Sequence, residues 1–319
     1  MLKKIKQKIF ISLAVAGLLY LGFTIYADYH KVAMAFKQFN WLLFPLLLAL
    51  SFSNYVVRFI KWDYYLRLLK IKVSRVDSFS IFMSGLIMSI TPGKMGELLK
   101  SYLVKQITGE PISKTAPIIF VERITDFVSL VFIALIGAYI FNYGRTISLA
   151  VAIFFLLIVI IISIKPIALP IINSLERVKF LRKYVAAFHN AYESSYQMLR
   201  PVPLINMVAV SLVSWFFECF GYYVILKNFN IPNVGLLWSS FSYAFATIVG
   251  AITMLPAGLG VTEGSLTFML VKKGASSDIA VATTFIIRVV TLWFAVLVGI
   301  IGVSFYQKRF GKLAEDNIN

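Results

Sequence analysis

The sequence predicts an all-α polytopic membrane protein with six full spans and two re-entrant helical hairpins that form an inverted repeat. Of its 319 residues, 60% are hydrophobic and only 14% are charged, whereas soluble domains are typically about half apolar and about a quarter charged. The apolar residues gather in long runs, and a helix needs roughly 20 of them to cross a bilayer. Because the runs are too continuous for the alternating pattern of a membrane β-strand, helices are expected.

The formal net charge of +17 would suggest a nucleic-acid partner in a soluble protein. In a membrane protein the cytoplasmic loops collect lysine and arginine, so no nucleic acid is expected here. The one cysteine, Cys219, lies in an apolar run and allows no intramolecular disulfide. Since no small-residue cleavage site follows the first apolar segment, that segment is predicted to be a retained helix rather than a removed signal peptide.

Six apolar runs are long enough to be full spans. They cover about residues 9–27, 41–60, 115–141, 145–164, 203–226 and 279–306. Residues 165–200 alternate apolar and basic side chains at roughly helical spacing, which predicts an amphipathic helix on the cytoplasmic surface. That segment is too short to bury a core of its own, so the chain is predicted to be a single transmembrane domain.

A half-length apolar segment precedes the third span. Ser78 to Thr91 is 14 residues long, about 21 Å as a helix, against a hydrocarbon core of about 30 Å. It stops at Pro92 and Gly93, which end helices, and residues 94–106 follow as a second short helix. Two half-helices joined by a breaker predict a re-entrant hairpin, since irregular backbone at membrane depth must be covered by protein or line a water-filled cavity.

A second breaker, Pro256-Ala257-Gly258-Leu259-Gly260, precedes the last span. The apolar segment before it, residues 236–255, is long enough to cross alone, so a re-entrant and a fully spanning path both stay open. With six spans and two hairpins, the basic N-terminus, residues 61–77, residues 165–200 and the basic tail share one side. The positive-inside rule makes that side the cytoplasm, which predicts a cytoplasmic-membrane protein with both termini inside.

The two breakers head similar stretches of sequence. Each is followed by a glutamate, Glu97 in the first and Glu263 in the second, and later by an arginine. Arg123 lies 26 residues after the first glutamate and Arg288 lies 25 after the second. Each arginine begins an apolar run of the same length that ends at a glycine. The shared order of breaker, acid and base predicts a repeat, and chance similarity among apolar segments is the alternative.

The repeats cover about residues 41–141 and 203–306. In the predicted topology the first hairpin enters from the cytoplasm and the second from outside, so the repeat is inverted. Inverted repeats whose broken helices meet near the midplane are a recurring plan of transporters. Movement of a molecule across the membrane is therefore the leading mechanism.

Ionisable side chains inside spans cost about 2.5–3.5 kcal/mol each at a helix centre and are functional candidates. The hairpin tips, at Lys94 and at Gly258 and Gly260, place helix N-termini where free N–H groups favour anions. Arg123 and Arg288 would add guanidinium groups, which can hold a phosphate through two hydrogen bonds. These residues, together with Pro92 and Gly93 at the first tip, are predicted to bind an anionic substrate.

The acidic candidates leave several roles open. Glu97 and Glu263 either pair with an arginine until an anionic substrate displaces them, couple transport to protons, or act as structural clamps at helix starts. Glu122 and Asp126 lie four residues apart and share a helix face. With Arg123 they form either a functional polar patch or a solvated helix end.

Two more charges lie inside predicted spans. Glu218 is deep in its helix, as a structural partner or as a cavity residue, and Arg58 is expected to snorkel to the nearby interface. His30 and His189 both fall in polar segments. No paired Cys/His spacing, phosphate-binding glycine loop or nucleophile elbow occurs, so no metal site, cofactor or catalytic residue is predicted.

Taken together, these motifs resemble the lysylphosphatidylglycerol synthase transmembrane region, also called the flippase-like domain family, over roughly residues 10–306. The resemblance rests on Pro92-Gly93-Lys94-Met95-Gly96-Glu97, Glu122-Arg123-Ile124-Thr125-Asp126, Leu255-Pro256-Ala257-Gly258-Leu259-Gly260-Val261-Thr262-Glu263 and Arg288. It implies an integral membrane protein that acts on anionic or polyisoprenyl-phosphate lipids. Because neither an aminoacyltransferase nor a glycosyltransferase domain accompanies these motifs, aminoacylation by this chain alone is not expected.

The predicted function is that of a lipid translocase that moves a membrane phospholipid or a lipid-linked sugar, with the headgroup in a polar cavity between the hairpins. One alternative is a membrane-embedded transferase with Glu122 or Asp126 as general base. Another is a non-catalytic accessory subunit for a separate cytoplasmic synthase or glycosyltransferase. The sequence leaves the lipid, the direction, the energy source and the oligomeric state open.

Overall fold

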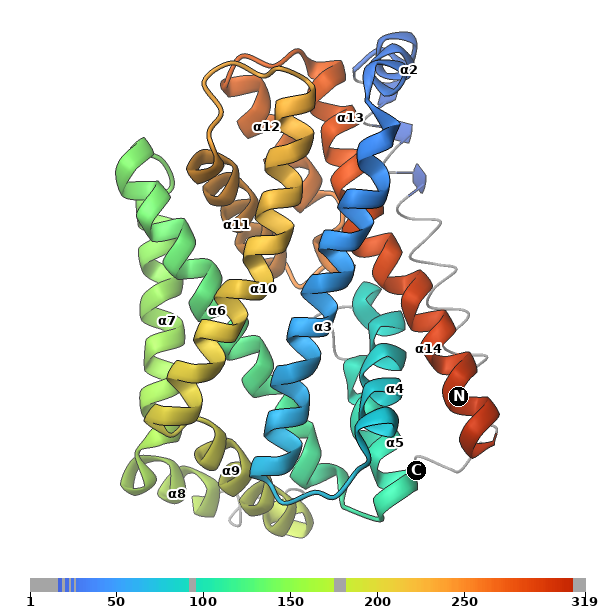
Figure 1. Cartoon of the computed structure of the whole chain (residues 1–319). Coiled ribbons are helices and arrows are strands. Elements are labelled where there is room, and N and C mark those ends of the chain that lie inside the picture. Colours follow the sequence, from blue (N-terminus) through green and yellow to red (C-terminus); the bar gives the residue numbers. More distant parts are fainter. Residues whose placement is uncertain are drawn as a thin grey trace.

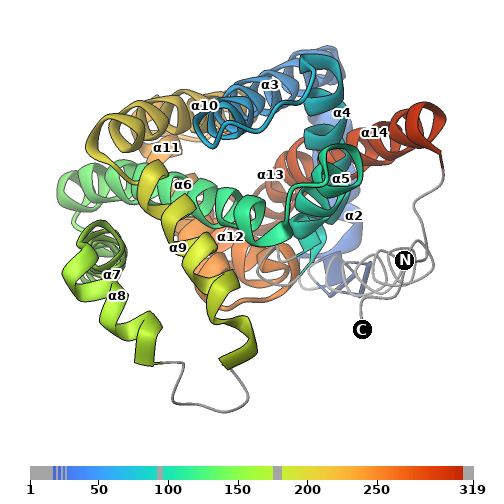
Figure 2. The same ribbon diagram turned by 90° about the horizontal axis from the view of Figure 1, so that it is seen from below.

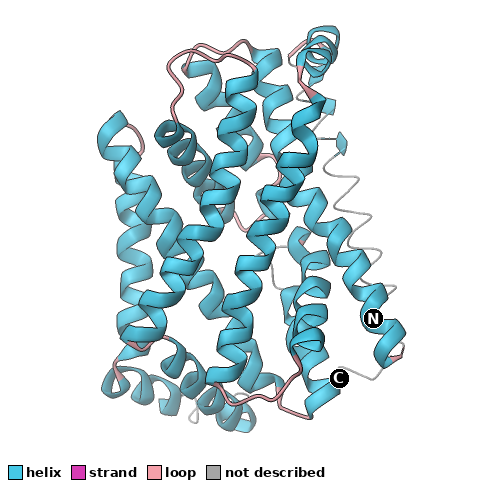
Figure 3. Ribbon diagram, in the orientation of Figure 1, coloured by secondary structure: helices cyan, strands magenta, loops and turns pink. Residues whose placement is uncertain are grey.

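The computed structural model describes residues 17–18, 21–22, 24–25, 27–91, 96–174 and 182–311. Within them the chain is built of helices joined by turns and loops (Figure 3). Five of these helices are long and apolar enough to cross a membrane: Trp41–Leu68, Ile112–Phe141, Arg145–Ser163, Pro201–Asn228 and Ser277–Phe310. The predicted helical membrane class is confirmed. Five predicted spans correspond to these helices, and the sixth, 9–27, lies largely outside the described residues.

The first helices in the described part are α2 (Tyr29–Gln38), η1 (Trp41–Leu43) and α3 (Phe44–Leu68). The predicted end of the second span at residue 60 is wrong, because α3 continues for about two more turns. Lys61, Trp62 and Tyr65 are fully buried, and their spacing continues the inward face of the helix. Lys61 therefore belongs to the span and not to the loop that follows it.

The first helical hairpin lies at the lower end of Figure 1 and consists of α4 (Arg75–Gly85), η2 (Leu86–Ile90) and α5 (Leu99–Thr108). Ser74 caps α4, because its hydroxyl accepts a hydrogen bond from the Asp77 backbone nitrogen at 3.2 Å. Gly109, at φ 75°, ends α5 in the left-handed conformation. The two short helices agree with the predicted half-helices, and the tip at residues 92–95 lies outside the described part.

Three long helices, α6 (Ile112–Phe141), α7 (Arg145–Ser163) and α10 (Pro201–Asn228), run along the molecule. Residues 165–200, predicted as one amphipathic helix, form instead α8 (Lys165–Ser174), η5 (Arg182–Tyr184) and α9 (Val185–Met198). A new helix starts at Lys165 because Ile164 takes an extended conformation. Viewed from below, α9 crosses α6 and packs against it (Figure 2).

The second hairpin lies at the upper end of Figure 1 and consists of α11 (Leu236–Ile252), η6 (Pro256–Gly258) and α12 (Val261–Lys272). The 17 residues of α11 are about 25 Å long as a helix, less than a bilayer core. The chain then reverses through a left-handed tip, with φ of 65° at Gly258 and 84° at Gly260. Glycine adopts these angles without steric cost, and α12 returns alongside α11.

The last long helix is continuous from α13 (Ser277–Arg288) through a π-helical turn (Val289–Trp293) to α14 (Phe294–Phe310). Single π turns inside α-helices are rare and often mark functional sites. Here the Thr291 carbonyl oxygen accepts a hydrogen bond from the Tyr55 hydroxyl at 2.6 Å. This bond ties α3 to the π turn that follows Arg288.

The two hairpins approach from opposite ends of the molecule, and η2 of the first contacts η6 of the second in the middle (Figure 1). Ile90 of the first hairpin packs with Leu259 of the second, and Leu292 and Val296 complete this small apolar cluster. Apolar residues thus line the contact between the described parts of the two hairpins.

Glycines on two long helices allow the hairpins to pack closely against them. A Cβ atom at Gly137 of α6 would lie 2.3 Å from the Phe241 side chain of α11. At Gly299 of α14 it would lie 2.1 Å from the Ile87 backbone nitrogen of the first hairpin. Each long helix therefore packs closely against the hairpin of the other half of the chain.

Candidate functional site

A cluster of buried charges lies where α3, α5 and α6 meet, and we call it the central charge cluster. Its members are joined by ion pairs of 4.0 Å or less, and every side chain is at most 17% exposed. They are Arg58, Lys61, Glu97, Lys100, Glu122, Arg123 and Asp126. Four cations thus face three carboxylates in a place where isolated charges are costly.

Asp126 is the most highly connected carboxylate. Its Oδ1 lies 2.5 Å from Lys61 Nζ and accepts a hydrogen bond from the Ser211 hydroxyl at 3.1 Å. Its Oδ2 lies 3.4 Å from an Arg58 nitrogen and 3.5 Å from an Arg123 nitrogen. One oxygen is therefore held tightly and the other loosely, since charge-assisted hydrogen bonds are usually about 2.7–2.9 Å long.

Lys100 bridges the two glutamates of the cluster. Its Nζ lies 2.6 Å from Glu122 Oε2 and 3.4 Å from Glu97 Oε2. The same ammonium group lies 4.7 Å from the centre of the Trp62 ring, where a cation–π interaction adds to its stability. Glu97 also pairs with Arg123 at 3.1 Å, so the start of α5 is tied to the middle of α6.

The second hairpin has a separate ion pair. Arg288 Nε lies 2.6 Å from Glu263 Oε1, and a terminal nitrogen of Arg288 donates to the Ala257 carbonyl at 2.8 Å. The other oxygen of Glu263 accepts a hydrogen bond from the Gly260 backbone nitrogen at 2.8 Å. Glu263 therefore caps α12 and holds the arginine at the same time.

Glu218 joins the scaffold to the second hairpin. Its Oε2 accepts a hydrogen bond from the Tyr243 hydroxyl at 2.7 Å, which links α10 to α11. This contact gives Glu218 a structural partner, one of its two predicted roles.

The structure places the described site residues in two separate groups, one in the central charge cluster and one at the second hairpin. Glu97 pairs with Arg123 and Glu263 pairs with Arg288, at the two positions predicted from the repeat. Glu122 and Asp126 are 1% and 2% exposed, so they do not form a solvated helix end. Pro92, Gly93 and Lys94 lie outside the described residues, while Gly258 and Gly260 form the tip of the second hairpin.

Arg58 does not snorkel to the interface as expected. Its side chain is only 11% exposed and points to Asp126 on a neighbouring helix. Lys61 and Lys100 were not predicted at all, although both are buried at the centre of ion pairs. The missed signal was helical spacing: Lys61 follows Arg58 by three residues, and Lys100 follows Glu97 by three, so each falls on the face of an already suspected charge.

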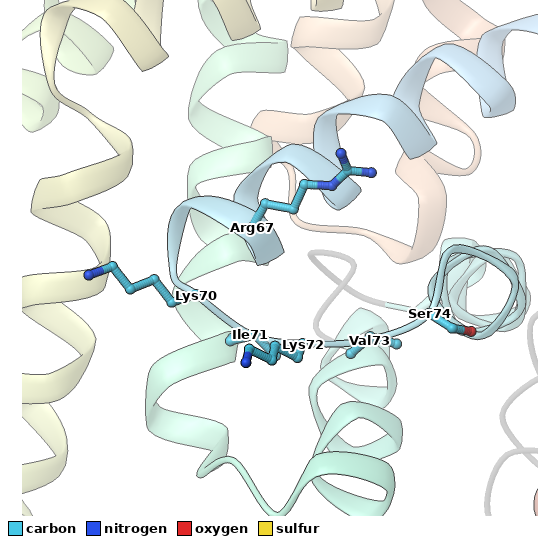
Figure 4. Close-up of a pocket in the computed structure, with 6 residues that line it drawn as sticks. All are labelled: Arg67, Lys70, Ile71, Lys72, Val73 and Ser74. Atoms are coloured by element: carbon cyan, nitrogen blue, oxygen red, sulfur yellow. The ribbon is translucent and has the colours of Figure 1, made fainter.

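The polar cavity predicted between the hairpins stays a prediction. An open cavity of about 680 Å³ lies at the turn between α3 and α4, lined by Arg67, Lys70, Ile71, Lys72, Val73 and Ser74. Figure 4 shows its basic side chains pointing in different directions and not converging on one point. This arrangement suits a basic membrane surface better than a site for one bound molecule.

In the described part of the chain, no group of three or more His, Cys, Asp and Glu residues could hold a metal ion. The central charge cluster has instead an excess of cationic donors, all held by helices of the first half of the chain. Such an arrangement can bind and release an anionic group through exchange of ion-pair partners.

Comparison with known proteins gives a consistent family. A profile described as the lysylphosphatidylglycerol synthase TM region matches residues 9–299. A UPF0104 membrane protein of Methanocaldococcus jannaschii is 28% identical over 220 residues, which cover 67% of this chain and 91% of that protein. A UPF0104 membrane protein of Methanothermobacter thermautotrophicus is 22% identical over 326 residues, which cover 94% of both chains.

Proposed function

The chain belongs to the lysylphosphatidylglycerol synthase TM region family, and from this premise we propose that it is a lipid translocase. It would move an anionic or polyisoprenyl-phosphate-linked lipid across the cytoplasmic membrane. The observation that carries the proposal is the central charge cluster. Seven ionisable side chains buried within apolar helices are expensive to keep, and they mark a pathway for polar groups in many membrane proteins.

The arrangement of the hairpins supports a transport mechanism. In the proposed topology both hairpins are re-entrant, the first from the cytoplasm and the second from outside. Their equivalent ion pairs, Glu97–Arg123 and Glu263–Arg288, support an inverted repeat. Transporters with this plan place the substrate site where the broken helices meet.

Basic residues support the proposed orientation. Residues 67–75, at the lower end of Figure 1, contain four lysines and arginines and no acid. The last helix ends at Phe310 on the same side, after Lys308 and Arg309. By the positive-inside rule this end faces the cytoplasm, which would place the C-terminus and, with a sixth span at 9–27, the N-terminus inside.

The proposed mechanism exchanges partners within the cluster. A lipid phosphate would replace a carboxylate on an arginine while the acyl or prenyl tails stay in lipid. Arg123 and Arg288, with Lys94 at the tip, would bind the phosphate, and Glu97 and Glu263 would pair with these arginines when no lipid is present. In the closed state these ion pairs keep each carboxylate next to a cation, which lowers the cost of holding the charges inside the membrane.

Flipping of a fluorescent anionic lipid in proteoliposomes tests the proposal. Arg123→Ala and Arg288→Ala should each reduce the flipping rate sharply while the protein remains folded. Arg67→Ala, a change at an exposed arginine on α3, should leave the rate near that of the wild type. Equal rates in all three variants would exclude the mechanism.

A membrane-embedded transferase is the alternative, and a new covalent lipid product would identify it. Its candidate bases, Glu122 and Asp126, lie 2.6 and 2.5 Å from lysine ammonium groups and are buried. Buried and tightly paired in this way, both carboxylates have little access to a substrate. An accessory role beside a separate synthase or glycosyltransferase would appear as normal lipid movement in both arginine variants.

A further inference from the structure

The four cations of the central charge cluster differ in how many of their N–H donors already have hydrogen-bond partners. Lys61 Nζ has four oxygen neighbours within hydrogen-bond distance, from Asp126, Ser211, Thr125 and the Glu122 backbone. An ammonium group has only three protons to donate, so this lysine has no capacity left. It is a fixed part of the structure.

Lys100 is likewise fully occupied by contacts within the protein. Its short contact with Glu122, its second contact with Glu97 and the Trp62 ring surround the ammonium group on several sides. Its side chain is 2% exposed. The two lysines therefore hold the carboxylates in place and are not available to a substrate.

The two arginines have donors to spare. Arg58 and Arg123 each carry five N–H groups in a planar fork, and the Nε atoms of both are buried without a hydrogen-bond partner in the described part of the chain. Their contacts with Asp126, at 3.4 and 3.5 Å, are longer than a good charge-assisted hydrogen bond. Buried unpaired donors are costly in a native protein, and the oxygens of an anionic group would satisfy them.

We propose that Arg58 and Arg123 form a two-guanidinium site for a lipid phosphodiester, in which the phosphate displaces Asp126 Oδ2. This inference rests on the proposed function and names the substrate class of its site. Both arginines already converge on one carboxylate oxygen, and a phosphodiester presents two free oxygens to such forks. The cluster has four cations and three carboxylates, so one negative charge neutralises it.

The same reasoning separates the two arginines of the repeat. Arg288 is bound at 2.6 Å to Glu263 and at 2.8 Å to the Ala257 carbonyl. This geometry holds the tip of the second hairpin in shape. Arg58, which has no counterpart in the repeat, adds a second guanidinium beside Arg123, because both reach the same oxygen of Asp126.

Two kinds of lipid carry a singly charged phosphodiester: phosphatidyl lipids and polyprenyl-phosphate sugars. Phosphatidylglycerol and a polyprenyl-phosphate hexose should each be titrated into the purified full chain in neutral detergent, with binding measured by native mass spectrometry. A glucosyl diacylglycerol, which has no phosphate, serves as the reference lipid. At least one phosphodiester lipid should bind well above this reference, and the better one identifies the source.

Arg58→Gln should weaken binding of that lipid roughly tenfold to a hundredfold, the usual range for a lost charge-assisted hydrogen bond. Arg58→Lys keeps the charge but should still lose affinity, because lysine lacks the planar fork. Arg67→Gln is the matched control on the same helix and should bind as the wild type does. Equal binding of the lipid by the Arg58 and Arg67 variants would overturn the inference. A polyprenyl-diphosphate lipid that binds the wild type more tightly than both phosphodiester lipids would also overturn it.

The flipping assay distinguishes the two proposals. If the wild type binds the phosphodiester lipid through Arg58 but moves no lipid in proteoliposomes, the proposed function fails and the binding site stands. If the wild type flips lipid and the Arg58 variants bind and flip normally, the site fails and the function stands.

Discussion

Replacing Lys61 by methionine should strongly destabilise the protein. Methionine has a similar length and suits an apolar site, so the substitution removes the charge with little change in volume. The Lys61 side chain is 0% exposed and lies 2.5 Å from Asp126. Without this ammonium group, Asp126 loses its shortest contact while remaining inside the protein.

The size of the effect follows from the contacts that remain. Loss of one partner of a buried ion pair costs about 3–5 kcal/mol. Asp126 keeps the Ser211 hydroxyl at 3.1 Å and the two arginines at 3.4 and 3.5 Å, so we expect about 3 kcal/mol, the lower end of that range. At about 2–4 °C per kcal/mol, the scale for domains of 150–250 residues, this lowers the unfolding temperature by roughly 6–12 °C.

Thermal unfolding in detergent, followed by circular dichroism, measures the change. Arg67→Met is the matched control, because Arg67 lies on the same helix in an ion pair with Asp63 but is 56% exposed. Exposed pairs contribute about 0–1 kcal/mol, so its unfolding temperature should stay within about 4 °C of the wild type. Similar shifts for the two variants would refute the claim that the Lys61 pair is a structural centre of the fold.

Two further substitutions test the packing around the site by the same measurement. Gly299→Ala should destabilise the protein by about 1–3 kcal/mol, because the new Cβ would lie 2.1 Å from the facing backbone nitrogen of Ile87. Gly221→Ala is the control and should be neutral or slightly stabilising, since the nearest facing atom lies 3.7 Å from its new Cβ. Equal effects of the two substitutions would contradict the close approach of α14 to the first hairpin. Tyr55→Phe should lower the free energy of unfolding by about 1–3 kcal/mol, because it removes the hydroxyl that donates to the Thr291 carbonyl. Tyr139→Phe, at a 59% exposed position, is the control and should cost less than about 0.5 kcal/mol. An unchanged stability of the Tyr55 variant would mean that the π turn does not need this hydrogen bond.

Much of the architecture could be predicted from local sequence patterns. The apolar runs predict the five spans that the structure describes. The breaker at residues 256–260 predicts the reversal of the chain in the second hairpin. The pairings Glu97–Arg123 and Glu263–Arg288 followed from order and spacing, because a buried charge in lipid needs an opposite charge nearby. These features depend on hydrophobic burial and on charge neutralisation, so residue types and their spacing are enough to predict them.

The centre of the site could not be predicted in the same way. Lys61 was assigned to a loop because hydropathy alone ends the span before it, yet its partners Asp126 and Ser211 come from α6 and α10. A lysine can stay inside a helix bundle only if distant segments supply its acceptors. The spare donors of Arg58 likewise depend on which carboxylate the fold places opposite it. Such contacts arise from tertiary structure, and local spacing does not reveal them.

A lipid translocase must offer its polar headgroup a path and yet keep the membrane sealed. The central charge cluster meets both needs if its two kinds of cation have different tasks. Lys61 and Lys100, with contacts of 2.5 and 2.6 Å to carboxylates, keep negative charge in place whether or not a substrate is bound. Arg58, held to Asp126 only at 3.4 Å, can exchange that carboxylate for a phosphate at little cost in pairing. Because Lys61 keeps Asp126 paired while the phosphate balances the fourth cation of the cluster, the number of unpaired charges in the membrane need not rise while the headgroup crosses.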